Sequence, residues 1–459
     1  VAGSSSVNLA TGSMIINNPL ISTTDSLMPY TVSLIYDTAR ASTNISSYMP
    51  DGFKLNLFEQ IVPSNVTENG SAVRTYILTD TDGTEHRFYP VSSDTSYRDE
   101  DGLQLQLTTP GLNLSGNMYI TDVNKTVRRY KEVQTISKWV LSEITDKNGN
   151  KLSFAFDSSS RPISISMTPS GGSAITHLTI SYNSSGKPYI IWNQNTKDAV
   201  IFRYSATYNG DVASSAGKYL REVVFAHGSA SVTAANWLNF YNNASTATNI
   251  TVDGAAHYWY DSSGYITSAE DGPSKYTLIY DYSASRVSGI SELGYPAQGQ
   301  EIKFEYFTGY TEVKTSGKDD QLDTSDDIIS RYVFDSSGRT VTSYSMDSAR
   351  TQIYGVSSGE YEAENKNAAN RLKMSSVSGG TSANYLLNGG FEEIDGLLYW
   401  GKTGTVTYTS QSTLDGAAAW LTVGANATSS IYQDTWLRAG TYTLSADIDN
   451  TKLKGAEIW

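Results

Sequence analysis

The sequence predicts an all-β fold, and two observations support that prediction. The first is composition: the 459 residues include 32 Tyr and 37 Gly, a balance that favours strands and turns over helices. The second is a short phrase that occurs five times, in which an aromatic residue is followed by Asp, Asn or Ser, by small polar residues and often by Gly. Strand-like runs rich in β-branched and aromatic residues flank the phrase, so the repeated unit is predicted to be a β-hairpin.

Each copy of the phrase fits a tight turn. An Asp or Asn at the first position accepts a hydrogen bond from a backbone N–H two residues on, and a Gly at the fourth position adopts positive φ without a Cβ clash. The clearest copies begin at Tyr182, Tyr260 and Phe334, and looser copies begin at Phe156 and Tyr282. One such unit cannot bury its own apolar face, so the copies are predicted to stack into an extended surface.

In chain order, the pattern predicts four parts. Residues 1–130 alternate strands with turns at irregular spacing, and residues 131–356 contain the phrased hairpins, interrupted by an inserted loop or short helix around residues 233–238. Residues 357–383 are rich in Ser, Asn and Ala and are predicted to be a linker. Residues 384–459 change pattern and are predicted to form a partial β-sandwich.

Two of these parts contain finer predictions. Within the linker, a short helix is predicted at residues 362–373. In the last part, strands are predicted near residues 406–408, 418–423, 430–433 and 442–448.

Composition excludes several classes of function. A net charge of −14 and a pI near 4.8 argue against a nucleic-acid groove, which needs clustered Lys and Arg. The absence of Cys excludes disulfides, thiol catalysis and thiolate metal sites. No run approaches the roughly 18 apolar residues that a membrane-spanning helix needs. A large, acidic, cysteine-free β protein is typical of bacterial surface or secreted proteins, and both ends of the chain look like cuts through a longer pattern.

Several ordered motifs resemble the RHS-repeat (YD-repeat) proteins, whose animal relatives are the teneurins. The phrase that begins at Phe334 and continues as Gly-Arg-Thr-Val resembles the YD repeat itself. Residues 7–13 (VNLATGS), 52–57 (GFKLNL) and 97–103 (YRDEDGL) resemble successive blocks of the bacterial members. The resemblance covers roughly residues 7–354.

The resemblance implies a spirally wound strip of antiparallel hairpins that forms a hollow shell. In bacterial members the shell often encloses a variable C-terminal toxin. The family's self-cleaving site contains an Asp-Pro bond, and this chain has no Asp-Pro dipeptide. The cleavage activity and the identity of a cargo therefore do not carry over.

The last part resembles the start of galactose-binding-like jelly rolls of carbohydrate-binding modules. Residues 388–392 (NGGFE) followed by Trp400 match the opening pattern of those modules. Only about 75 residues are present here, so the resemblance implies a partial jelly roll. Phe391 and Trp400 are expected in its core rather than at a ligand, and Glu392 could support a structural ion.

One acidic segment is the candidate metal site. Five carboxylates within nine residues repel one another unless a hard cation neutralises them, and Ca²⁺ accepts six to eight oxygens in flexible geometry. The spacing differs from that of an EF-hand, and the alternative is a solvated hairpin tip. The predicted calcium ligands are Asp319, Asp320, Asp323, Asp326 and Asp327.

The remaining chemistry-bearing residues favour structural interpretations. The four histidines, His86, His177, His227 and His257, lack metal-ligand spacing. Adjacent acids, as in residues 99–101 and 392–393, point to opposite faces of a strand, which disfavours a glycosidase pair. The aromatic runs 189–192 and 258–260 could stack on sugars, but alternate aromatics in a repeat wall more often pack between its layers.

Three functions follow from the sequence, in order of preference. The first is a non-enzymatic extracellular shell segment that scaffolds or encloses another part of the parent protein, such as a C-terminal toxin. The second is a cell-surface adhesin that binds glycans through its jelly roll. The third is an all-β polysaccharide-degrading enzyme. The expected partners are the rest of the parent polypeptide or its cargo, or cell-surface carbohydrate, with no nucleic acid and no membrane span.

Overall fold

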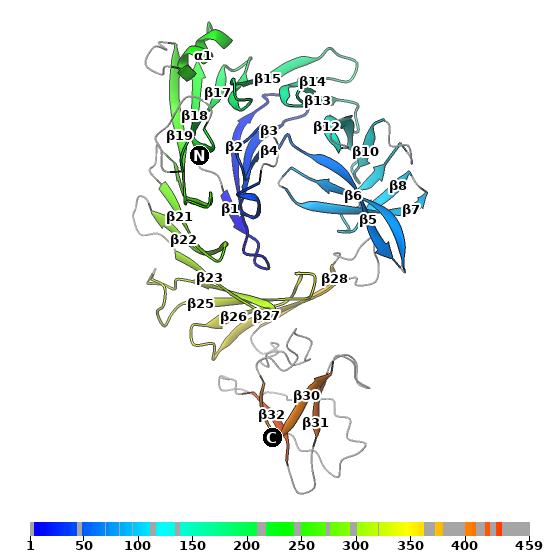
Figure 1. Ribbon diagram of the computed structural model, residues 1–459, viewed down its shortest axis with the longest axis vertical. Helices are drawn as coiled ribbons and strands as arrows, with labels where there is room; N and C mark the ends of the chain where they lie inside the picture. The colour runs from blue at the N-terminus through cyan, green and yellow to red at the C-terminus, as the bar shows by residue number, and fades with distance from the viewer. Residues whose placement is uncertain are drawn as a thin grey trace. The chain divides into compact units, whose positions relative to one another are not determined.

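A computed structural model describes most of the chain. The described residues are 4–43, 48–68, 70–81, 83–93, 95–110, 116–133, 138–208, 217–242, 249–271, 276–293, 301–319, 321–361, 372–379, 400–409, 418–422 and 428–433. These residues confirm the all-β prediction, because antiparallel strands joined by short turns dominate and the described part contains one short α-helix, α1 (Ala234–Asn242) (Figure 1). None of the described helices is long and apolar enough to cross a membrane.

Contacts divide the chain into two units, which are described separately. The first unit consists of residues 1–8, 13–299 and 361–371. The second unit consists of residues 9–12, 300–360 and 372–459. These units do not follow the four predicted parts, whose boundaries stay predictions.

The first unit begins with a small antiparallel sheet in the order β1-β2-β3-β4. Its strands are β1 (Ser4–Val7), β2 (Met14–Ser22), β3 (Thr31–Asp37) and β4 (Phe53–Leu55). The five consecutive residues 32–36 of β3 are all buried, because this sheet is covered on more than one side. We call it the N-terminal sheet.

The next strands pair in sequence and then close on themselves. They are β5 (Gln60–Glu68), β6 (Ser71–Thr79), β7 (Glu85–Ser93), β8 (Ser96–Asp99), β9 (Gln106–Thr108), β10 (Met118–Thr121), β11 (Val127–Val133) and β12 (Lys138–Thr145). Each pairs with the next, and β12 also pairs with β5 through Trp139↔Ile61 and Val140↔Gln60. We call β5–β12 the eight-strand ring.

Side chains fill the ring. Alternate residues of its strands point inward, as the two-residue period of a strand requires. The most buried of these, each at most 2% exposed, are Ile61, Tyr76, Leu78, Phe88, Tyr97, Leu107, Met118, Ile120, Tyr130, Trp139 and Leu141. The rings of Tyr76 and Tyr97 meet edge to face at 4.9 Å. The ring is therefore a packed core rather than a pore.

A run of hairpins, which we call the hairpin strip, follows the ring. Its strands are β13 (Lys151–Phe156), β14 (Pro162–Thr168), β15 (Ile175–Tyr182), β16 (Pro188–Asn193), β17 (Asp198–Ser205), β18 (Tyr219–Gly228), β19 (Ile250–Tyr260), β20 (Ile266–Asp271), β21 (Tyr276–Ser283) and β22 (Arg286–Leu293). Each strand pairs antiparallel with the next. Of the inserted loop or short helix predicted around residues 233–238, the structure shows the helix, α1, between β18 and β19.

The two faces of the hairpin strip have different neighbours. On one face, Trp237, Phe240 and Tyr241 of α1 pack with apolar residues of β16–β18. The N-terminal sheet contacts the other face, where Asn18 donates to the Tyr258 hydroxyl at 2.8 Å and Phe53 lies 6.1 Å from the Tyr258 ring. The strip therefore lies between a helix and a sheet, which explains why its strands are rich in apolar residues at both alternating positions.

The second unit contains a further run of hairpins, the second strip. Its strands are β23 (Glu301–Phe307), β24 (Tyr310–Thr315), β25 (Ile328–Phe334), β26 (Thr340–Asp347) and β27 (Ile353–Tyr361). Their pairing is antiparallel and sequential. The core of this strip contains Ile329, Val333, Tyr344, Met346, Ile353 and Val356.

The stretch predicted as a linker contains strand. β27 continues to Tyr361, and β28 spans Leu372–Gly379, so the C-terminal end of the predicted helix at residues 362–373 is strand. The rest of that predicted helix lies outside the described residues. Residues 372–379 include three Ser, one Val and one Gly, residues of low helix propensity for which the helix prediction did not allow.

The last part contains two small pairs of strands. β29 (Gly401–Thr403) pairs with β32 (Ser430–Tyr432), and β30 (Thr405–Thr409) pairs with β31 (Ala418–Thr422). Three of the four strands predicted here are confirmed, whereas residues 442–448 and the NGGFE motif lie outside the described residues. The partial jelly roll stays a prediction.

Candidate functional site

The repeated turns share one hydrogen-bond pattern. The Asp261 side chain accepts from the backbone N–H groups of Ser263 and Tyr265, both at 2.9 Å. The Asp261 N–H donates to the Tyr265 carbonyl, and Gly264, at φ 93°, donates to the Asp261 carbonyl. The same pair of side-chain hydrogen bonds occurs at Asp122, Asp146, Asp157, Asn183 and Asp335. The predicted roles of Asp, Asn and Gly are therefore confirmed.

Two copies differ from the predicted turn. In the copy that begins at Phe156, Ser160 occupies the fourth position with φ 61° in place of glycine. In the copy that begins at Tyr282, Ser283 pairs directly with Arg286, and both Ala284 and Ser285 have positive φ. That copy is a two-residue hairpin turn, because it lacks an acidic or amide side chain to hold the longer loop.

Four tyrosines at strand ends join consecutive hairpins. Each hydroxyl donates to a backbone carbonyl close to the end of the preceding turn, across the strip. We call these contacts tyrosine braces, and they are Tyr182 to Pro162 O (2.6 Å), Tyr204 to Pro188 O (2.6 Å), Tyr282 to Ile266 O (2.7 Å) and Tyr260 to Leu220 O. Where the aromatic residue of the phrase is a tyrosine, it thus links neighbouring units, a role that its position in the sequence did not indicate.

The same aromatic residues mark irregularities in strand pairing. A shift in register lies immediately before each of Phe156, Tyr182, Tyr204, Tyr260, Tyr282 and Phe334. A β-bulge adds one residue to one strand and increases local twist. Such a bulge recurs at the same place, before the aromatic residue, in these hairpins.

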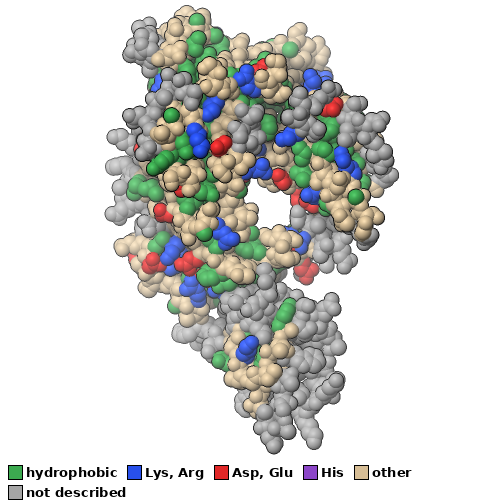
Figure 2. Space-filling model, in the orientation of Figure 1, with side chains coloured by type: hydrophobic (Ala, Val, Ile, Leu, Met, Phe, Trp, Pro, Cys, Tyr) green, Lys and Arg blue, Asp and Glu red, His purple; other side chains and the backbone are tan. Residues whose placement is uncertain are grey.

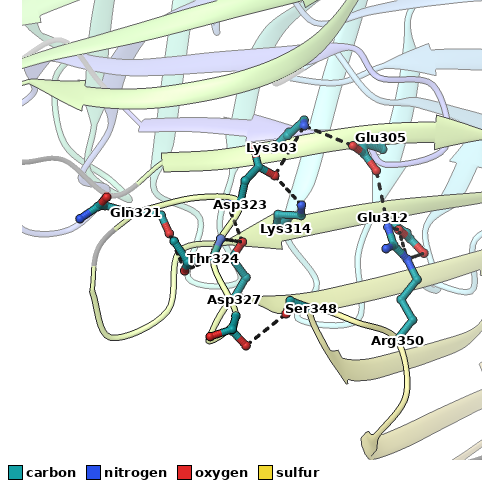
Figure 3. A network of polar contacts seen from close by, with 11 residues as sticks. Lys303, Glu305, Glu312, Lys314, Gln321, Asp323, Thr324, Asp327, Ser348 and Arg350 are labelled. Atoms are coloured by element: carbon teal, nitrogen blue, oxygen red, sulfur yellow. Dashed lines mark hydrogen bonds and ion pairs between the residues drawn. The ribbon is translucent and has the colours of Figure 1, made fainter.

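The acidic loop lies between β24 and β25 (Figure 3). Asp323 contacts the Lys314 ammonium at 2.7 Å, and Asp326 accepts from the Lys318 backbone N–H at 2.6 Å. Asp327 is buried, and its carboxylate accepts from the backbone N–H groups of Asp323 at 2.7 Å and Thr324 at 3.2 Å. These three predicted ligands are therefore engaged in an ion pair or in hydrogen bonds with groups of the second strip and its loop.

Two predicted calcium ligands remain, Asp319 and Asp320. Asp319 accepts from the Gln321 backbone N–H at 3.0 Å, and Asp320 lies outside the described residues. Among the described residues, no three His, Asp or Glu side chains form a group that could hold a metal ion. Calcium binding by this loop stays a prediction.

Beside the loop, a buried carboxylate is held by two arginines. The Glu312 side chain is 3% exposed and accepts from Arg331 Nε at 2.9 Å and from Arg350 Nε at 3.0 Å (Figure 3). Burial alone would raise the pKa of Glu312, but the hydrogen bonds from Arg350 and Arg331 outweigh it and lower the pKa. Figure 2 likewise shows acidic and basic side chains next to one another over this strip.

A ladder of alternating charges crosses the hairpin strip. Arg203, Glu222, His257 and Glu270 are direct cross-strand partners on β17–β20. The Arg203–Glu222 contact is 2.9 Å and the His257–Glu222 contact is 3.1 Å. The hydrogen bond to Glu222 raises the pKa of His257, so the ladder favours an imidazolium.

All four histidines contact carboxylates. His177 lies 3.7 Å from Asp25, and His227 lies 2.8 Å from Asp253. His86 lies 2.5 Å from Asp101 and 3.1 Å from Asp80. Its hydrogen bonds to Asp101 and Asp80 raise the pKa of His86 to about 10. These histidines pair with acids from separate turns or strands, as expected of ion pairs.

The ring also contains a buried carboxyl that sequence reasoning missed. Glu59 is 3% exposed and accepts a hydrogen bond from the Tyr130 hydroxyl. Burial raises its pKa, against the opposing effect of Arg128. The signal available in the sequence was a lone acid beside the apolar strand that begins at Gln60.

The aromatic runs 189–192 and 258–260, which could stack on sugars, are mostly buried. Tyr258, Tyr260 and Trp192 are at most 8% exposed. Trp259 is half-buried, with the Arg221 guanidinium 4.8 Å from its ring. The packing interpretation of both runs is therefore confirmed for these residues.

The adjacent acids of residues 99–101 have separate roles. Asp99 accepts from the backbone N–H groups of Leu103 at 2.6 Å and Leu105 at 2.7 Å, whereas Asp101 pairs with His86. The second acidic pair, residues 392–393, lies outside the described residues.

Comparison with known proteins gives only distant structural matches. No protein-family model and no curated protein sequence matches this chain. The N-terminal domain of effector protein SpvB from Salmonella typhimurium is similar, with 10% identity, a TM-score of 0.29, and coverage of 58% of this chain and 99% of that domain. The TcdB2-TccC3-Cdc42 structure has 8% identity and a TM-score of 0.26, and the match covers 81% of this chain.

A third match, to TcdB2-TccC3, has 9% identity, a TM-score of 0.25 and coverage of 82% of this chain. This chain spans about a quarter of the TcdB2-TccC3 chains, since the matches cover 25% and 22% of them.

Proposed function

We propose that this chain is a non-enzymatic, extracellular wall segment of a bacterial protein of the RHS-repeat type. In this role it scaffolds or encloses another part of its parent polypeptide, such as a C-terminal cargo. The proposal attributes the function to the extended surface of the strips rather than to a reaction centre.

The tyrosine braces are the observation that best supports this proposal. Each brace ties a hairpin to the one before it through a side-chain-to-backbone hydrogen bond, in addition to the strand pairing. Repeated turns of one geometry and repeated bulges at one position supply the regular curvature that a wall needs. The turn acids such as Asp157 and Asp261 and the four histidines are engaged in turns and ion pairs, as a structural role requires.

Protease protection tests the proposal. The chain is expressed together with the segment that its gene encodes next, and the intact protein is treated with a broad-specificity protease. We expect the neighbouring segment to survive at protease concentrations that degrade the same segment expressed alone. Equal digestion of the two forms would rule out enclosure.

A matched pair of variants links that protection to the braces. The triple variant Tyr182→Phe, Tyr204→Phe, Tyr282→Phe removes three hydroxyls from braces and should shorten the lifetime of the protected segment. Tyr332→Phe removes a hydroxyl from a half-buried position on β25 that takes part in no brace, and should leave protection unchanged. Turnover of a polysaccharide by the purified chain would instead support the enzymatic alternative.

Glycan binding is the second candidate. Tyr408 and Tyr432, on β30 and β32, are 38% and 51% exposed, and exposed aromatic faces can stack on sugar rings. A glycan array with the intact protein would test it, and loss of a signal in Tyr408→Ala and Tyr432→Ala would assign the binding to these strands.

A further inference from the structure

The ring closes through one short seam. Every other strand pairing among the described residues of the first unit joins strands that are consecutive in the chain. The β5–β12 pairing has only two residue pairs, together with a backbone hydrogen bond of 3.0 Å from Leu141 N–H to the Glu59 carbonyl. We call these contacts the seam. The seam is thus the shortest pairing of the ring, and no local hairpin supports it.

A buried acid occupies this seam. Glu59 immediately precedes β5, its backbone carbonyl is part of the seam, and its side chain accepts from the Tyr130 hydroxyl on β11. A hydroxyl is a neutral donor and does not cancel the charge of a carboxylate. Protonated Glu59 fits this environment, whereas ionised Glu59 places a charge inside a packed core.

The charged and titratable groups that face Glu59 come from four neighbouring segments. They are Arg128 and Tyr130 of β11, Lys54 of β4, Asp80 after β6, and Tyr30 before β3. Arg128 and Lys54 favour the ionised form of Glu59, whereas Asp80 disfavours it. Burial is the largest effect, and it raises the pKa of Glu59 despite the two cations.

We propose that the seam is a proton-controlled opening point of the eight-strand ring, closed when Glu59 is protonated and loosened when Glu59 is ionised. The folded ring then binds this proton more tightly than the unfolded chain does. Its closure is therefore strongest below the ordinary pKa of Glu, about 4.3, and weakens as pH rises through the raised pKa. Loosening would expose the apolar interior of the ring without unfolding the hairpin strip.

Hydrogen exchange of the whole protein tests the proposal. The protection factor of the Leu141 amide, which donates to the Glu59 carbonyl, corrected for the intrinsic exchange rate, should fall at least tenfold between pH 5 and pH 8.5. Protection at β17 and β18 of the hairpin strip should stay constant over that range. Equal protection of the seam at both pH values in the wild-type protein would overturn the proposal without any variant.

Three substitutions sharpen the test. Glu59→Gln keeps a neutral acceptor for Tyr130 and should abolish the pH dependence of the seam. Glu143→Gln removes the same charge from β12 at a position that pairs with Arg129 and Lys151, and should retain the wild-type dependence. Persistence of the dependence in Glu59→Gln would assign it to another group, such as His86, and overturn the proposal.

Tyr130→Phe provides a readout that a purely structural role would not change. The Tyr130 hydrogen bond lowers the pKa of Glu59, so its removal should move the midpoint of loosening to higher pH. An unchanged midpoint in a folded Tyr130→Phe protein would contradict control by Glu59.

Discussion

The eight-strand ring and the hairpin strip use ionisable residues in opposite ways. The ring buries Glu59 and His86 among side chains from separate segments, and both have a raised pKa. The hairpin strip places acids such as Asp157 at exposed turns. Burial there would raise the pKa of Asp157, but hydrogen bonds from Arg161 and Ser159 outweigh it and lower the pKa. The partners of a carboxyl thus decide the sign of its pH response, because donors from arginine or backbone N–H groups can outweigh burial, as they do at Asp157 and at the buried Glu312.

The largest expected difference concerns apolar packing. Trp139→Ala in the ring should lower the free energy of unfolding by about 3–5 kcal/mol, because the side chain is 2% exposed. Trp259→Ala in the hairpin strip should cost about 1–2 kcal/mol, because its ring is half-buried beside Arg221. Urea unfolding measures both, and equal losses would contradict the contrast.

The buried ion pair of the second strip should rank next. Glu312→Gln removes the charge that Arg331 and Arg350 share, and leaving Arg331 buried beside a neutral side chain should cost about 3 kcal/mol. Glu143→Gln, at a partly exposed pair with Arg129, should cost less than about 1 kcal/mol. The same unfolding assay measures both variants. If Glu312→Gln costs no more than Glu143→Gln, the ion pairs of Glu312 with Arg331 and Arg350 do not stabilise the fold.

The pH response separates the two regions further. With a folded pKa of about 10 against about 6.5 in the unfolded chain, His86 stabilises the ring fully below about pH 6.5. That contribution disappears as pH rises towards 10. His86→Gln should remove about 1–2 kcal/mol of this dependence, after allowance for solvent screening. The turn acids have their effect at low pH. Asp157 stabilises the fold above about pH 4, and this stabilisation is lost as pH falls through its lowered pKa.

Thermal melts at about pH 2, 7 and 10 can check both halves of this prediction. His86→Gln and the wild-type protein should differ least at pH 10, and Asp157→Asn and the wild-type protein should differ least at the acid end. If the melting temperatures of a variant and the wild-type protein differ by the same amount at all three pH values, titration of that residue does not explain its effect on stability.

The smallest expected effects concern the tyrosine braces. Each of Tyr182→Phe and Tyr282→Phe should cost about 1 kcal/mol, the usual net value of one hydrogen bond. Because the two braces share no partner, the costs should add in the double variant. Tyr332→Phe serves as the control in the same urea titration, and a cost equal to that of the brace variants would mean that the hydroxyl contacts contribute nothing specific.

The hairpins could be predicted from the sequence because every signal for them is local. In the turn at Asp261, the acid, the glycine and the flanking aromatic residues lie within six positions, and the hydrogen bonds follow from those types. The tyrosine braces are less visible, since Tyr260 contacts Leu220 across an interval of 40 residues. Nothing near Tyr260 in the sequence specifies that carbonyl.

Closure of the ring could not be predicted for the same reason. It depends on the pairing of Ile61 with Trp139, and two apolar residues far apart in a β-rich chain have many equivalent partners. In the acidic segment, by contrast, a local signal was present but did not identify the partners of the acids. Its charge density indicated a cation, whereas nearby donors such as Lys314 engage these acids, and their positions follow only from the register of β24 and β25.

The tyrosine braces have a mechanical consequence. A pull on the last strand of the hairpin strip would load one phenol and one strand pair at a time, because each hydroxyl reaches only to the neighbouring hairpin. Extension should therefore proceed in steps of one hairpin, as a sawtooth trace in a single-molecule tether, rather than by one collective rupture.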